Sequence, residues 1–186
     1  TSTRIAAGTA VQGPRITAGW NIGQVLVTNG SIFEATIIAG RAIGSIDVRR
    51  GIDIDPSNPN VLPSSADNGN ITTDGLTFTI GNTIAAGDSI SSVNVQGNVN
   101  LAFILSGTVD FGADQVPAGT GVNHDTFKWG WINSVNVVGD VYALVISSGM
   151  DTGPDGIYNT GDDLVVPGAS RIDTVTIGGS AAFVSA

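Results

Sequence analysis

Apolar and short polar residues alternate along most of the chain, in runs separated by glycine-rich turns. Val, Ile and Thr dominate these runs, whereas strong helix formers are scarce, with only one Lys, one Glu and one Met. An alternation with a period of two places every second side chain on the same face of a β-strand. The pattern therefore predicts an all-β chain of short strands joined by tight turns.

One short phrase, Ile-x-Ser-Val-x-Val in its commonest form, recurs along the chain. Clear copies are "ISSVNVQG" from Ile90, "INSVNVVG" from Ile132 and "IDTVTIGG" from Ile172, and looser copies are "IGQVLV" from Ile22 and "IGSIDV" from Ile43. Successive starting isoleucines are 21, 47, 42 and 40 residues apart. A repeated unit of roughly 20 residues, or twice that length, is typical of a solenoid.

Each copy holds a strand, a glycine corner and a second apolar run in the same order, which predicts a coiled parallel sheet. The Val-x-Val alternation turns the valines inward, so Asn94, Asn136 and Thr176 should line up on the outer face of successive coils. We therefore predict a right-handed parallel β-helix, or β-solenoid, with long acidic loop insertions. Residues 1–186 would form a single unit, with repeats starting near residues 22, 43, 90, 132 and 172. An antiparallel β-sandwich is the alternative that the composition also permits.

The repeated phrase, followed by Ser-Gly and the acidic loop "GPDGIYNTGDD", resembles repeats in large bacterial cell-surface and adhesin-like proteins with right-handed parallel β-helix architecture. The resemblance covers about residues 20–186. It implies secretion and a structural or adhesive role, and it transfers no catalytic residue.

The charge balance narrows the possible partners. The net charge is −9, with seven Lys and Arg residues against sixteen Asp and Glu residues. Binding to a nucleic acid requires clustered Lys and Arg, so nucleic acid is excluded as a partner. No run approaches the roughly 20 apolar residues that span a bilayer. The chain also has no cysteine, so an exported protein of this kind would need a stabiliser other than disulfides.

The loop "MDTGPDGIYNTGDD", residues 150–163, places four aspartates and three glycines between two apolar runs. Calcium takes six to eight oxygen ligands from such turning segments, and crowded carboxylates repel one another without a cation. The loop departs from an EF-hand, because Gly153 occupies the third position and no helices flank it. We predict calcium as a cofactor, and a solvated turn is the alternative. The predicted metal ligands are Asp151, Asp155, the Ile157 carbonyl, Asn159, Asp162 and Asp163, with a weaker pair at Asp110 and Asp114.

The segment "GVNHDTFKWGW" is the other place that resembles a site of chemistry. His124 has Asp125 as a carboxylate neighbour, but no nucleophile partner is identifiable, so a structural role is favoured over proton transfer. Trp129 and Trp131 precede Ile132 and are expected to pack over the core. The alternative function, a polysaccharide-binding or polysaccharide-degrading parallel β-helix module, would use the acidic loops and these two tryptophans.

The preferred hypothesis is a non-enzymatic, extracellular structural protein, such as a surface-layer, adhesin or filament subunit. Calcium in the Asp/Gly loop would stabilise it, and the protein would assemble through exposed strand edges. The end coils of a solenoid expose unpaired backbone groups and apolar core. The predicted partners are therefore further copies in a homo-oligomer or head-to-tail filament, or neighbouring repeats of a longer chain, with carbohydrate as a further ligand.

Overall fold

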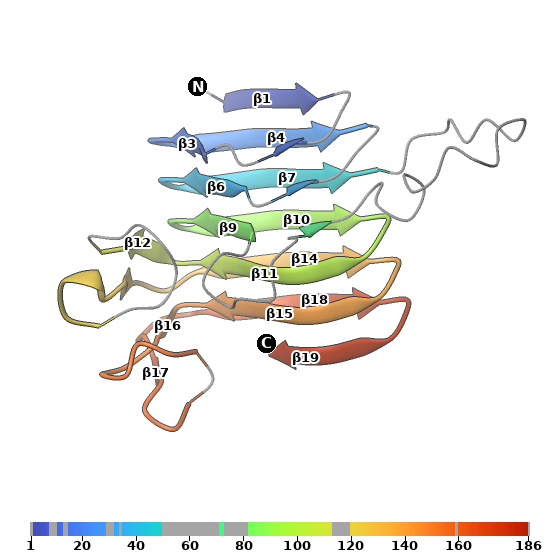
Figure 1. Ribbon diagram of the computed structural model, residues 1–186. Helices are drawn as coiled ribbons and strands as arrows, with labels where there is room; N and C mark the ends of the chain where they lie inside the picture. The colour runs from blue at the N-terminus through green and yellow to red at the C-terminus, as the bar shows by residue number, and fades with distance from the viewer. Residues whose placement is uncertain are drawn as a thin grey trace, which may run out of the picture.

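The computed structural model describes residues 2–7, 11–12, 15–28, 32–33, 35–49, 71–72, 82–112, 120–158 and 160–185. Over these residues the chain is all-β, apart from one short 3-10 helix, η1 (Gly121–Asn123). Figure 1 shows strands stacked one above another, with the N-terminus at one end of the stack. No helix in the described part of the chain is long and apolar enough to cross a membrane.

The first large sheet has six strands, and all of its ladders are parallel. In spatial order its strands are β1 (Ser2–Ala7), β4 (Asn21–Val27), β7 (Ala42–Val48), β10 (Ser89–Val95), β14 (Trp131–Val137) and β18 (Arg171–Ile177). Chain order and spatial order agree along the whole sheet. Each strand therefore pairs with the equivalent strand of the next coil, which is the arrangement of a β-solenoid.

The second large sheet is also parallel and covers the other sides of the coils. Its strands are β2 (Val11–Gln12), β5 (Ile32–Phe33), β8 (Ile71–Thr72), β3 (Arg15–Ala18), β6 (Thr36–Ala39), β9 (Asn82–Ala86), β11 (Val99–Ser106), β15 (Val141–Ser148) and β19 (Ala181–Ser185). The start of β11 pairs with β8, whereas the rest of β11 pairs with β9. Between these halves Leu101 has a φ of 53°, and Ala143 at the same level of β15 has a φ of 58°. This left-handed residue turns the strand, so each of these two coils has three straight sides.

The register sets the starting isoleucines of the repeated phrase level with one another: Ile22, Ile43, Ile90, Ile132 and Ile172. The first four are at most 1% exposed and point into one continuous apolar core. In β10, Val93 and Val95 join Ile90 there, so the period of two holds from Val93 onward, whereas Ile90 lies three residues before Val93. The core is therefore a column of Ile and Val side chains that runs the length of the stack.

The residues between the inward valines face outward in a second column. Asn94 is level with Asn136, and Asn136 is level with Thr176, which confirms the predicted alignment. The antiparallel sandwich is wrong for the described residues, because both large sheets are parallel. Antiparallel pairing in that part of the chain is confined to two hairpins, β12 (Thr108–Asp110) with β13 (Thr126–Phe127) and β16 (Met150–Asp151) with β17 (Leu164–Val165).

Glycines stack on one another at the corners of the coils, where two backbones approach closely. A Cβ added at Gly40 would lie 2.3 Å from the carbonyl oxygen of Gly19, and one added at Gly87 would lie 2.1 Å from the carbonyl oxygen of Gly40. At the opposite corner, a Cβ on Gly139 would lie 2.6 Å from the carbonyl oxygen of Gly97. Because these distances leave no room for a side chain, the glycines fix the spacing between coils.

The two hairpins form a layer beside the stack, visible on one side of Figure 1. We call residues 108–112, 120–128, 150–158 and 160–165 the hairpin layer. Phe111 and Tyr158 of this layer pack with Leu105 on the outer surface of the second sheet, in a hydrophobic cluster separate from the main core. The Tyr158 ring centroid lies 6.1 Å from that of Phe103 and 6.3 Å from that of Phe127. These aromatic contacts hold the insertions against the solenoid.

Candidate functional site

The acidic loop begins and ends in the β16–β17 hairpin, so its two ends are held together by backbone pairing. Inside the loop, the Asp151 Oδ1 accepts a hydrogen bond of 2.9 Å from the Gly153 N–H. The Asp155 Oδ1 accepts one of 2.8 Å from the Ile157 N–H. Gly153 and Gly156 both have a φ of 67°, in the region that favours glycine. Aspartates and glycines therefore build the turns of the loop directly.

Thr160 lies at the centre of the carboxylates. Its Oγ1 is 2.7 Å from the Asp162 Oδ1, 3.1 Å from the Ile157 carbonyl oxygen, 3.3 Å from the Asp155 Oδ1 and 3.4 Å from the Asp163 Oδ1. A hydroxyl has only one proton to donate. Three carboxylates and one carbonyl therefore share a single donor, and the loop concentrates negative charge around one point.

Hydrogen bonding favours the ionised form of the loop. The hydrogen bond from the Thr160 hydroxyl is the largest influence on Asp162 and, with the Asp155 backbone N–H at 3.2 Å, lowers the pKa of that carboxyl. Neither Asp155 nor Asp162 forms an ion pair with a Lys, Arg or His in the part of the chain that the structure describes. Among the described residues, hydrogen-bond donors are what balances their charge.

The structure brings together four of the predicted metal ligands, which are Asp155, the Ile157 carbonyl, Asp162 and Asp163. Asp151 lies at the base of the hairpin instead, where its Oδ1 is 3.2 Å from the His124 Nε2. Asn159 and Asp114 lie outside the described residues. Asp110 ends β12 with an exposed side chain. No group of three or more His, Cys, Asp or Glu side chains is placed to hold a metal ion in the described ranges.

The donor atoms around Thr160 are all oxygens, and they include a backbone carbonyl and a hydroxyl as well as carboxylates. This is the donor chemistry that calcium prefers, since it also takes backbone carbonyl oxygens such as that of Ile157. The residues therefore fit a hard cation in chemical type, whereas a softer metal would require His or Cys ligands.

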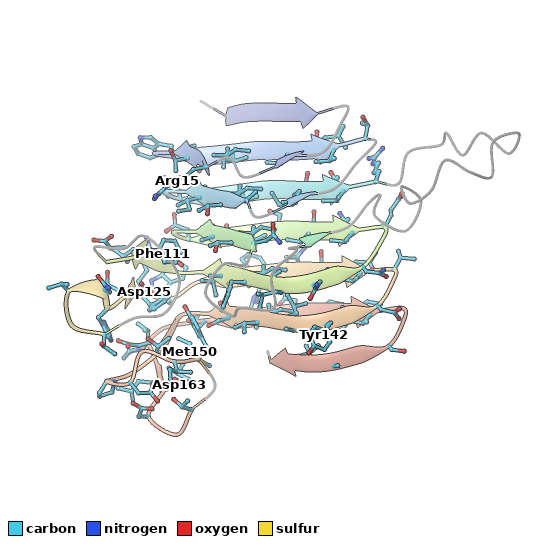
Figure 2. All side chains as sticks on the ribbon, in the orientation of Figure 1. Arg15, Phe111, Asp125, Tyr142, Met150 and Asp163 are labelled. Atoms are coloured by element: carbon cyan, nitrogen blue, oxygen red, sulfur yellow. The ribbon has the colours of Figure 1, made fainter. Side chains whose placement is uncertain are left out.

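Tyr158 anchors the loop against the second sheet. Its side chain is 9% exposed and packs in the hydrophobic cluster of the hairpin layer. Burial raises the pKa of its phenol, and the negative charges of Asp125, Asp163 and Asp151 raise it further. Asp125 itself is fully buried. The phenol therefore stays protonated over the physiological range of pH. Figure 2 shows Asp125, Met150 and Asp163 on the hairpins beside the stack.

The two tryptophans do not cover the core, so that expectation from the sequence is wrong. Trp129 is 50% exposed and Trp131 is 38% exposed. The Trp131 Nε1 donates a hydrogen bond of 2.9 Å to the Asp173 Oδ2, and the Arg171 guanidinium carbon lies 3.9 Å from the ring centre. The reason is the position of these residues at a corner of the coil, where side chains point away from the core.

A chain of charges along the same edge was not predicted. The Arg41 Nε lies 2.9 Å from the Asp88 Oδ2, and the Lys128 Nζ lies 2.5 Å from the Asp88 Oδ1. The Arg41 guanidinium also lies over the Trp20 ring, 5.3 Å from its centroid. Trp20, Arg41 and Asp88 each precede the starting isoleucine of their coil by two residues. That common offset is the sequence signal that would have revealed the contact.

The last coil differs from those before it. Ile172, Val175 and Ile177 of β18 continue the inward positions of β14, but they are only partly buried. Their counterparts in β14, among them Ile132 and Val135, are completely buried. Val184 of β19 is 37% exposed. The described part of the stack thus presents an open edge of two strands together with apolar core.

No known protein family, curated protein or solved structure matches the chain. Three features of this chain's own geometry bear on its function: the oxygen-rich centre around Thr160, the open apolar coil formed by β18 and β19, and the regular outward columns of the first sheet.

Proposed function

We propose that the chain is a non-enzymatic structural protein of the cell exterior, a right-handed β-solenoid that assembles end to end by adding coil to coil. The supporting observation is the open coil formed by β18 and β19. Its strands have the register of a coil inside the stack, but the apolar side chains on their inner face are only partly covered. A further parallel coil there, from a second copy of the chain or from a neighbouring repeat of a longer chain, would bury these side chains and pair the free backbone groups.

Such a contact joins different surfaces of the two copies, so it does not close on itself and propagates as a filament. Adding a coil requires no new kind of contact, because in a parallel ladder every coil presents the same row of backbone N–H and C=O groups to the next coil. A filament, adhesin or surface-layer role accords with this geometry. It also accords with the abundance of short, regular coils.

Calcium in the acidic loop is the second part of the proposal. Asp155, Asp162, Asp163 and the Ile157 carbonyl would supply oxygen ligands, with Thr160 between them. A bound cation would balance the negative charge of the carboxylates, which otherwise share one hydroxyl proton as a hydrogen-bond donor. Because Tyr158 anchors the same loop against the second sheet, binding would also stiffen the hairpin layer. A site with so few charged ligands would bind calcium at the millimolar concentrations found outside cells.

Two variants on the same strand test the assembly. Val175→Asp places a charge on the inward face of the open coil, and Thr176→Asp places the same charge on the outward face of β18. Sedimentation velocity of the wild-type chain over a range of concentrations should show growing species. Val175→Asp should prevent this growth, because a second coil would have to bury the new carboxylate, and Thr176→Asp should leave it unchanged.

Circular dichroism of both variants establishes that the coils remain folded. Two results would contradict end-to-end assembly: a wild-type chain that sediments as a monomer at every concentration, or equal loss of association in both variants. Negative-stain electron microscopy in calcium and in chelator then shows whether the associated species are filaments and whether the cation holds them.

A further inference from the structure

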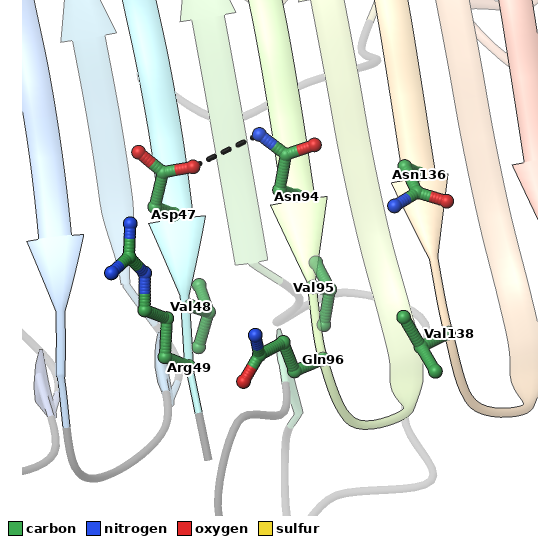
Figure 3. A pocket seen from close by; sticks show the side chains of 8 residues that line it. All are labelled: Asp47, Val48, Arg49, Asn94, Val95, Gln96, Asn136 and Val138. Atoms are coloured by element: carbon green, nitrogen blue, oxygen red, sulfur yellow. Dashed lines mark hydrogen bonds between the residues drawn. The ribbon is translucent and has the colours of Figure 1, made fainter. Parts of the chain in front are cut away.

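The outer face of the first sheet carries two columns of side chains that meet in a groove. Asp47, Asn94 and Asn136 form one column on β7, β10 and β14. Residues two positions further along the chain form the second column, as Figure 3 shows: Arg49, Gln96 and Val138. The groove between these side chains has a volume of about 340 Å³. It crosses three coils, a length of about 10 Å at the usual spacing between strands.

The groove is almost neutral in a protein whose net charge is −9. Its two charged side chains, Asp47 and Arg49, have opposite signs. The Asp47 oxygens are already engaged: Oδ2 accepts hydrogen bonds of 2.8 Å from the Gln24 Nε2 and 3.0 Å from the Ser45 Oγ, and Oδ1 accepts one of 2.9 Å from the Asn94 Nδ2. A cation would have to displace these donors. A polyanion would find a single arginine, so neither kind of charged ligand suits the groove.

The remaining groups in the groove that could bind a ligand are side-chain amides. The Asn136 side chain is half-buried and forms no hydrogen bond within the described part of the chain. An amide offers two donors and one acceptor, so it matches a hydroxyl group, which both donates and accepts. Asn94 presents a second amide on the next coil; its Nδ2 already donates to Asp47, so its Oδ1 would accept a hydrogen bond from a hydroxyl. Val138, 57% exposed, adds an apolar contact at the edge of the groove.

We propose that this groove binds an uncharged, linear saccharide that lies along the axis of the stack. Its hydroxyls would hydrogen-bond to Asn136 and Asn94, and the C–H face of a ring would rest on Val138. A chain of sugar rings repeats its hydroxyls along its length, as the coils repeat their amides. This site does not depend on the open coil at β18 and β19, because it lies on the side of the stack and is complete within one chain.

The test uses the isotope-labelled wild-type chain and three neutral probes: cellohexaose, chitohexaose and mannohexaose. Binding should shift the side-chain amide resonances of Asn94 and Asn136 at saccharide concentrations up to about 10 mM. Asn136→Ala should raise the dissociation constant by a factor of about 2 to 10, as expected for the loss of one or two hydrogen bonds. Asn133→Ala is the matched control, since Asn133 is exposed on the same strand but does not line the groove.

Four results would overturn the proposal. In the first, none of the three probes shifts the two amide resonances. In the second, the shifts centre on Trp129 and Trp131, which would place a sugar site on the edge of the stack instead. In a third, both alanine variants weaken binding equally. In the fourth, hexagalacturonate, an acidic saccharide, binds more tightly than the neutral probes. Thermal unfolding of both variants confirms that the coils remain intact.

Discussion

At the corner before the first sheet, Gly19, Gly40 and Gly87 stack on one another in successive coils. Gly87→Ala would place a methyl group 2.1 Å from the carbonyl oxygen of Gly40, so the two coils would have to separate or tilt. We expect a loss of about 1–3 kcal/mol in the free energy of unfolding, typical of overpacking against a backbone that cannot withdraw. Urea unfolding followed by circular dichroism measures it.

Gly19→Ala is the control at the same corner, because nothing in the described part of the chain lies within 4 Å of a Cβ at that position. It should change the free energy of unfolding by no more than about 0.5 kcal/mol. A similar loss in both variants would mean that the corner needs glycine for its backbone freedom, and that close approach between coils is not the reason.

Ala143 occupies a conformation that an L-residue adopts at a cost of about 1–2 kcal/mol. Ala143→Gly removes that strain but also removes a buried methyl group, worth about 0.8 kcal/mol, and adds a backbone-entropy cost of about 0.5–1 kcal/mol. These terms offset one another, so the free energy of unfolding should change by less than about 0.5 kcal/mol. Ala102→Gly, at a buried strand position without the positive φ, should cost about 1.5 kcal/mol in the same urea experiment. Equal losses in both variants would contradict a strained bend.

Single residues also show what the sequence can and cannot predict. The inward positions of Val93 and Val95 and the outward position of Asn94 follow from a period of two. The bend at Leu101 and Ala143 does not follow, because neither residue is the Gly or Asn that usually marks a left-handed conformation. Leu101 and Ala143 lie at the same level of two paired strands, so the bend recurs in neighbouring coils without a residue type that would mark it.

Among the elements, the acidic loop gives the clearest expectation. At millimolar calcium the free energy of unfolding of the wild-type chain should rise by about 0.5–1.5 kcal/mol over its value in chelator. The Asp155→Asn, Asp162→Asn double variant should lose this increase, because two of the charged ligands are gone. Thermal unfolding with calcium, magnesium and chelator measures the difference.

Asp173→Asn is the matched control for the loop, since it removes one exposed carboxylate elsewhere on the surface. It should keep the calcium response. If calcium stabilises the double variant and the wild-type chain equally, then the cation binds elsewhere and the carboxylates around Thr160 form only a solvated turn.

The sequence predicted that Asp155, Asp162 and Asp163 gather, because they are close in a loop that must turn. It did not single out Thr160 as the centre, since a threonine in a turn carries no charge signal. The contact of His124 with Asp151 was also missed. It joins two hairpins that are distant in sequence and that pack together in the cluster around Tyr158.

At the scale of the whole molecule, carboxylates and one phenol set the dependence of stability on pH. Lys128 lowers the pKa of Asp88 through a hydrogen bond, with Arg41 adding to the effect against burial. Burial raises the pKa of Asp47, but its hydrogen bonds outweigh burial and lower it. Because the folded chain holds these protons less tightly than the unfolded chain, their contribution is complete above about pH 4–5 and is lost as the pH falls further.

Tyr158 acts in the opposite direction, since burial raises its pKa. Its contribution is complete below about pH 10 and is lost as the pH rises, because the unfolded chain then releases a proton that the folded chain keeps. In chelator, urea unfolding should therefore show a plateau between about pH 5 and 9, with a decline on both sides. Tyr158→Phe should reduce the alkaline decline and Tyr142→Phe, at an exposed position, should leave it unchanged. A decline of equal size in both variants would contradict this role for Tyr158.

The arrangement of the whole molecule was also predictable from the sequence only in part. Five level coils were predictable, because the starting isoleucines recur and the corners carry glycine. The second hydrophobic cluster was not, because Phe111, Phe127 and Tyr158 lie in insertions that have no period. Their packing depends on where two separate loops leave the same side of the stack, which one segment of sequence does not reveal.

Because Ile90, Ile132 and Ile172 are level whatever lies between them, a segment of some 40 residues behaves as a removable cassette. Deleting residues 132–171 would bring Ile172 directly after Trp131, at the corner where Ile132 now stands. The number of cassettes then sets the height of the molecule, at about 4.8 Å for each coil. Height and surface chemistry are thus encoded by different residues, so duplication or loss of a coil can lengthen or shorten the protein while its loops diversify independently.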